Sequence, residues 1–134
     1  MSRSGYYDDV DNNWDLICWR GAVASAIRGK RGQAFFKEML AALDKIETRS
    51  LIADDLIKEG EVCAIGAVGA SRGVDMSKID PEDHHAVAEA FGIPHALACE
   101  IMWMNDDYVY KETPETRFAR MRAWAQAQIK EPKP

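Results

Sequence analysis

Cys63 is the first candidate for a chemically reactive residue in this sequence. It stands in GEVCAIGAVGASRGVD, and His84 or His85 and then Asn105 or Asp106 follow further along the chain. A thiol becomes a nucleophile when a helix N-terminus or a histidine lowers its pKa, so this order permits a Cys-His-Asn or Cys-His-Asp triad. The apolar neighbours of Cys63 and the lack of a flanking oxyanion motif instead favour a small, buried, structural cysteine.

A basic turn is the second candidate. The stretch RGKRG places Arg28, Lys30 and Arg31 around two glycines, which let backbone N–H groups turn toward one point. The helix that follows adds the positive end of its dipole, which favours a phosphate, a carboxylate or an acidic partner. The spacing of a Walker A loop is absent. A solvated basic turn is the simpler interpretation, and these three residues are our candidate anion- or partner-binding group.

Aromatic and acidic residues gather in WMNDDYVYKE. Exposed aromatic side chains are frequent anchors of protein interfaces, and two adjacent carboxylates add charge beside them. We expect this loop to lie near the basic turn and to face a partner through Trp103, Asp106, Asp107 and Tyr108.

The segment 84–103 matches the helix-turn-helix template, because Gly92 separates two short apolar patterns. Base readout requires Arg, Asn, Gln or Lys on the exposed face of the second helix. Those side chains are missing from the positions that the template exposes, which are His95, Ala96, Cys99, Glu100 and Trp103. Sequence-specific DNA binding through this segment is therefore an alternative and not the main prediction.

The acidic N-terminal stretch DDVDNNWD resembles half of a calcium-binding loop. Oxygen-bearing side chains alternate there at Asp9, Asp11, Asn13 and Asp15. An EF-hand would need glycine where Trp14 stands and a bidentate glutamate where Arg20 stands. We therefore interpret the stretch as a polar cap for the first helix, and we expect no metal site and no cofactor.

Helical periodicity covers most of the chain and must position these candidates. A short helix over 51–59, capped by Ser50, is favoured over a hairpin through Glu59 and Gly60. Two helices joined by a turn at Gly92 are expected next. The first has Asp80 as its cap and Pro81 as its first residue, and the second begins at Pro94. The remaining helices are predicted over 14–28, 33–46, 62–70 and 114–129.

These elements predict an all-α protein, a compact bundle of about five to seven helices in a single domain. The alternative is an α fold with one short β-hairpin near 51–66. The domain is expected to span 1–134, with 1–10 and 130–134 frayed at its ends.

Composition limits the classes of function. Hydrophobic residues make up 47% of the 134, and no apolar run approaches the roughly 18 to 20 residues that span a bilayer. A formal net charge of −5 disfavours general binding to nucleic-acid phosphates. Cys18, Cys63 and Cys99 are widely spaced, which predicts reduced thiols and not a disulfide framework. The N-terminal residues carry no apolar signal, so we expect a cytoplasmic protein.

Three stretches carry a resemblance to a known group of proteins. NNWDLICWRGAVASAIRGKRGQAFFKEMLAALD, GEVCAIGAVG and AFGIPHALACEIMWMNDD with TPETRFARMRAW are similar to small uncharacterised proteins of phages and prophages. The second stretch, GEVCAIGAVG, and the third, which pairs AFGIPHALACEIMWMNDD with TPETRFARMRAW, also resemble, more loosely, a bacterial domain of unknown function. The resemblance implies a phage-associated context, in which proteins of this size often inhibit host machinery, including defence systems such as CRISPR.

The main hypothesis is a non-enzymatic binding protein that contacts a host or phage protein in the cytoplasm of the host cell. The second is a nucleic-acid-binding regulator that uses RGKRG, the segment 84–103 and the C-terminal arginines 117, 120 and 122. The third is a small enzyme centred on Cys63. The sequence leaves the partner and the oligomeric state open.

Overall fold

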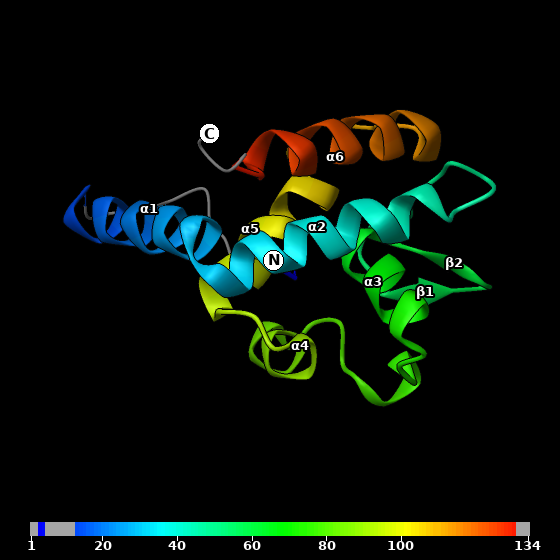
Figure 1. The fold of residues 1–134 in the computed structure, drawn as a ribbon, viewed down its shortest axis with the longest axis horizontal. Helices are drawn as coiled ribbons and strands as arrows, with labels where there is room; N and C mark the ends of the chain where they lie inside the picture. Colours follow the sequence, from blue (N-terminus) through cyan, green and yellow to red (C-terminus); the bar gives the residue numbers. More distant parts are fainter. Residues whose placement is uncertain (1–2, 5–12, 131–134) are drawn as a thin grey trace.

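The computed structural model describes residues 3–4 and 13–130, and these form six α-helices, one 3₁₀ helix and one two-stranded antiparallel sheet (Figure 1). The prediction of an all-α fold with a short hairpin as its variant is confirmed. Within the described ranges, no helix combines the length and the apolar character needed to cross a bilayer. The elements in chain order are α1 (Asn13–Arg28), α2 (Lys30–Asp44), β1 (Ile57–Lys58), β2 (Glu61–Val62), α3 (Ala64–Arg72), η1 (Met76–Lys78), α4 (His84–Phe91), α5 (His95–Asp106) and α6 (Pro114–Gln128).

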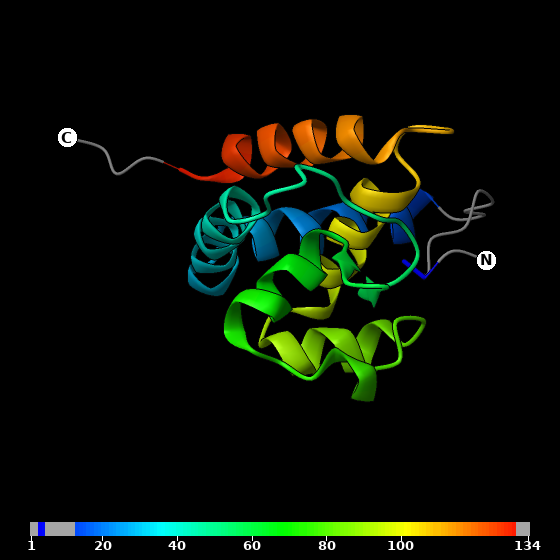
Figure 2. The ribbon, with the colours of Figure 1, turned by 90° about the vertical axis from the view of Figure 1, so that its right-hand side faces the viewer.

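Helix α5 occupies the centre of the fold. It contacts α1, α3, α4 and α6, while α2 packs between α3 and α6. Figure 2 shows α6 and α4 on opposite sides of the molecule with α5 between them. Nearly every residue of α5 from Leu97 to Asn105 is buried, as expected for a helix that is covered on all sides.

The core forms where the apolar stripe of α2 meets its neighbours. Phe35, Phe36, Met39 and Leu43 recur at helical spacing and are all buried, as the sequence pattern predicts. Phe36 meets Trp124 of α6 edge to face, with ring centroids 5.3 Å apart. This stripe joins the two halves of the chain, because α6 follows α2 by many residues.

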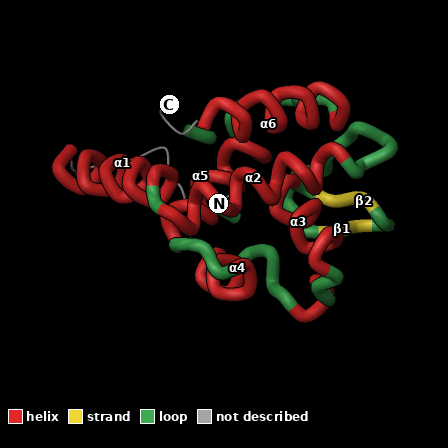
Figure 3. Tube along the Cα trace, in the orientation of Figure 1, coloured by secondary structure: helices red, strands yellow, loops and turns green. Residues whose placement is uncertain are grey.

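The segment predicted as a helix over 51–59 is instead extended and ends in the hairpin (Figure 3). Ile57 pairs with Val62 and Lys58 with Glu61. Asp54, Glu59 and Gly60 have φ values of 69°, 53° and 81°, which a right-handed helix does not allow. The helix prediction was wrong because amphipathic spacing in a short window does not exclude a turn.

Helix α4 begins three residues later than predicted, at His84 and not at Pro81. Asp80 accepts a hydrogen bond from the backbone N–H of Glu82 at 2.9 Å, so it closes a turn. Asp83 caps the helix, its carboxylate accepting from the N–H of Ala86 at 3.1 Å.

The predicted fraying of both ends lies mostly outside the described residues. Arg3 and Ser4 are described and buried. At the other end, the N–H of Lys130 donates to the Gln33 side chain at 2.8 Å. The described parts of both ends are therefore joined to the body of the fold.

Candidate functional site

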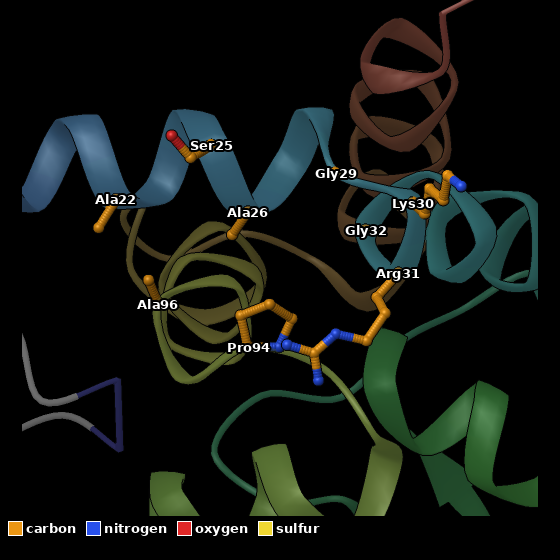
Figure 4. A pocket seen from close by; sticks show the side chains of 9 residues that line it. All are labelled: Ala22, Ser25, Ala26, Gly29, Lys30, Arg31, Gly32, Pro94 and Ala96. Atoms are coloured by element: carbon orange, nitrogen blue, oxygen red, sulfur yellow. The ribbon is translucent and has the colours of Figure 1, made fainter.

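The basic turn borders an open hollow between α1, α2 and the start of α5. The hollow has a volume of about 510 Å³. Arg28, Lys30 and Arg31 are all exposed, and Figure 4 shows Arg31 extending toward Pro94 while Lys30 points away from it. Small residues form most of the lining, which consists of Ala22, Ser25, Ala26, Gly29, Lys30, Arg31, Gly32, Pro94 and Ala96. The structure thus places two of the three predicted basic residues beside a mainly apolar depression.

A close approach of α1 and α2 creates this depression. A Cβ atom added to Gly32 would lie 2.0 Å from the carbonyl oxygen of Ala26, so only glycine fits there. The break between the two helices is the single residue Gly29, and α2 starts earlier than the sequence pattern suggests. The helices therefore turn sharply, and their small side chains leave the surface open.

The stretch predicted as an aromatic and acidic loop is partly helical, because α5 continues to Asp106, and the rest of it follows at that end of α5. Tyr108 is 56% exposed, and its ring meets Trp103 edge to face at 5.6 Å and the Arg120 guanidinium at 5.4 Å. Asp107 is also exposed. Because α5 has 12 residues, a length of about 18 Å separates its ends. The loop and the basic turn do not form the single surface that we expected.

Asp106 does not belong to the exposed loop. Its carboxylate pairs with the Arg3 guanidinium, with Nη2 and Oδ1 2.9 Å apart, and both side chains are 1% exposed. Burial alone lowers the pKa of Arg3, but Cys63 and the Asp106 carboxylate outweigh this and raise it. Arg3 therefore stays charged, and the buried Asp106 carboxylate is not available for contact with a partner.

Cys63 lies beside this ion pair, fully buried, as the cap of α3. Its Sγ accepts from the N–H of Gly66 at 3.3 Å and from Nη1 of Arg3 at 3.7 Å. Asn105 accepts from the N–H of Ala64 at 3.1 Å and donates to Asp106 at 2.7 Å. We call Arg3, Cys63, Asn105 and Asp106 the polar hub.

The polar hub contains two of the three parts of the triad considered from sequence. Asn105 and Asp106 approach Cys63, but His84 and His85 instead contact His95. The sulfur is fully buried at the start of α3, beside the Arg3 guanidinium. The arrangement does not assemble a Cys-His-Asn or Cys-His-Asp triad.

The helix-turn-helix template fails in the structure. The turn exists, since Gly92 has φ 68° and ends α4. The second helix is the buried α5, and its Glu100 is 4% exposed and ion-paired with Arg20 at 2.8 Å. A helix enclosed in this way cannot enter a DNA groove.

The C-terminal arginines are engaged within the chain. Arg117 is buried and donates to the carbonyl oxygens of Asn105 and Leu51 at 2.9 and 3.0 Å. Arg120 forms a bidentate pair with Glu112, both N–O distances being 2.8 Å. Arg122 pairs with Asp44 at 2.7 Å. These pairs connect α6 to the body and compete with any phosphate contact.

Sequence reasoning did not connect three histidines that the structure brings together. The ligand nitrogens of His84, His85 and His95 all lie within 4.8 Å of one another. We call these residues the histidine cluster. A usable signal was present, because two histidines begin one short helix and a third begins the next. The expectation of no metal site did not take these three histidines together.

The fold and these sites define a small all-α protein with a basic-edged hollow, a buried polar hub and a histidine cluster. No protein-family model, curated protein sequence or solved structure matches the chain.

Proposed function

We propose that this chain is a non-enzymatic binding protein that contacts another protein through the hollow at the α1–α2 turn. The observation that carries the proposal is the position of Lys30 and Arg31 on the lining of a mainly apolar depression. A solvated basic turn needs no such depression. The partner should present an apolar side chain flanked by carboxylates, because burial of apolar area supplies affinity and charge complementarity supplies orientation.

Helix α1 extends this surface. Figure 1 shows its first turns projecting beyond the other helices. Leu16 is 42% exposed and Ile17 is 62% exposed. Leu16 lies two helical turns before the buried Val23, so it continues the core-facing stripe past the body of the fold. Exposed apolar groups on a projecting helix suit contact with a protein.

The phage-associated context and the cytoplasmic location are part of the proposal and rest on the sequence alone. Inhibition of a host defence system, including CRISPR, is the activity to test first. The polar hub supports a non-enzymatic protein, because its charged and polar groups bond to one another within the fold and are closed to a substrate.

The test is a quantitative affinity purification from host cells, with and without phage infection. The wild-type chain is compared with the double variant Lys30→Glu/Arg31→Glu and with the control Lys37→Glu/Lys58→Glu, which makes the same charge change at other exposed positions. A protein retained by the wild type and the control but lost from the double variant, and then bound by the purified chain, supports the proposal. A partner protein that is retained equally by the wild type, the double variant and the control would contradict the proposal.

The same proteins serve to test the nucleic-acid alternative. Binding of duplex DNA at low salt that disappears in the double variant, with no protein partner found, would replace a protein with a nucleic acid at this surface. No DNA binding at low salt removes that alternative.

A further inference from the structure

The histidine cluster is positioned by two helix starts. His84 and His85 occupy the first turn of α4, which Asp83 caps, and His95 is the first residue of α5. The turn at Gly92 folds α4 back on α5, and these helices pack directly. The three imidazoles therefore stand on regular backbone and not on a loop.

The rings contact each other closely. Nδ1 of His84 and Nε2 of His95 lie within hydrogen-bonding distance. The rings of His85 and His95 are stacked, with centroids 3.8 Å apart and planes at 10°. The centroids of His84 and His85 are 4.9 Å apart. The ring nitrogens of three residues therefore gather in one place.

Imidazole nitrogens that come from two helices and lie within 4.8 Å of one another can serve together as ligands of a divalent transition metal. Zn²⁺, Ni²⁺ and Cu²⁺ all bind imidazole nitrogen, and the Zn–N distance is about 2.0–2.1 Å. Three protein ligands leave a fourth coordination position on zinc for water. We propose that His84, His85 and His95 form a site for a divalent transition-metal ion, with Zn²⁺ as the reference ion. This inference does not rest on the proposed protein-binding hollow.

The surroundings of His95 fix one side of the site. Its ring meets Trp19 of α1 edge to face at 5.9 Å, and its Nε2 lies 3.4 Å from the Sγ of Cys99 one turn further along α5. Cys99 is buried, whereas His85 is exposed and His84 and His95 are partly exposed, so the three imidazoles are the ligands and Cys99 is their neighbour.

Calorimetric titration of the full, untagged chain with ZnCl₂ tests the proposal. We expect one Zn²⁺ per chain and a melting temperature that rises with Zn²⁺ concentration. The variants His84→Gln, His85→Gln and His95→Gln should each weaken binding by at least about tenfold, because loss of a ligand costs no less than loss of an outer-shell group. The control Glu89→Gln changes an exposed residue of the same helix and should bind normally.

Three results would overturn the proposal. They are the absence of Zn²⁺ binding, binding that survives in all three histidine variants, and loss of binding in Cys99→Ala while the histidine variants still bind. His85 is exposed, so His85→Gln keeps the test decisive even where the His95 variant fails to fold. Binding by Cys99→Ala within about threefold of the wild type supports a site made of imidazoles.

Discussion

The polar hub and the histidine cluster both bring ionisable groups together, but the hub joins residues 103 positions apart in the chain and the cluster joins two consecutive helices. In the hub, opposite charges meet and hydrogen bonds from Asn105 and backbone N–H groups complete the set. In the cluster, three groups of one kind contact one another at a partly exposed position. Buried groups with matched charges indicate a structural role. Three imidazoles in contact, each able to coordinate a metal, instead favour the binding of a metal ion.

Gly66→Leu should show the largest effect on the hub side of this comparison. A Cβ at Gly66 would lie 1.9 Å from the carbonyl oxygen of Leu56, so the start of α3 and the segment before the hairpin must separate. We expect a loss of more than about 4 kcal/mol in the free energy of unfolding, enough to unfold the chain. Circular dichroism and urea denaturation measure it.

Gly21→Ala is the matched control, because no atom lies within 4 Å of a Cβ built there. It should leave the stability unchanged or raise it by about 0.5–1 kcal/mol, since alanine favours helix over glycine. A folded Gly66→Leu protein with wild-type stability would show that α3 does not approach the backbone of Leu56.

Asp106→Ala should follow in size. The substitution leaves the Arg3 guanidinium buried without its counter-charge, which costs about 3–5 kcal/mol when the cation stays inside. Chemical denaturation compares it with Glu47→Ala at an exposed carboxylate, expected within about 0.5 kcal/mol of wild type. A loss below about 1 kcal/mol for Asp106→Ala would mean that Arg3 leaves the hub for solvent.

Cys63→Ser should have a smaller effect. A serine hydroxyl caps a helix and accepts from the N–H of Gly66 and from Arg3 as the sulfur does. We expect a loss of less than about 1.5 kcal/mol and unchanged partner binding. In the wild type, a mild thiol reagent should label the exposed Cys18 quickly and Cys63 only after denaturant is added. A folded Cys63→Ser protein that has lost its activity would move Cys63 into the functional machinery.

The smallest effect is a pH dependence on the cluster side. Burial, together with the charges of His85 and His84, lowers the pKa of His95 in the folded chain. Below the usual pKa of about 6.5, the unfolded chain then binds more protons than the folded one, so stability falls as the pH falls from neutral. Denaturation at a series of pH values should show a slope of less than one proton, reduced in His95→Gln. Stability that rises toward pH 5.5 in that comparison would contradict it.

Much of the fold could be predicted because apolar residues at helical spacing in the sequence form the buried faces of the helices. The stripe of α2, from Phe36 to Leu43, is buried as its periodicity indicates. The hairpin was predicted only as an alternative, since Ile57 and Val62 pair across a turn that depends on positive φ at Glu59 and Gly60. Short windows encode such local conformations poorly.

The candidate sites were harder to predict because they depend on which ends of helices meet. Asp106 follows an exposed-looking aromatic pattern, yet Arg3, 103 residues earlier, draws it inside. His95 looked like one exposed residue of a recognition helix, and its nearness to His84 follows from the angle between α4 and α5. Pairings between the ends of separate elements leave no periodic signal in one sequence.

The burial of Arg3 has a practical consequence for handling the protein. Its guanidinium is buried against the Asp106 carboxylate, so extra chain inserted directly beside Arg3 would disturb this pair. Lys130, near the other end, is exposed. An affinity label or fluorescent protein is therefore better placed on the Lys130 side of the fold than beside Arg3. A polyhistidine label would add competing imidazoles, so a peptide label without histidine suits metal titrations.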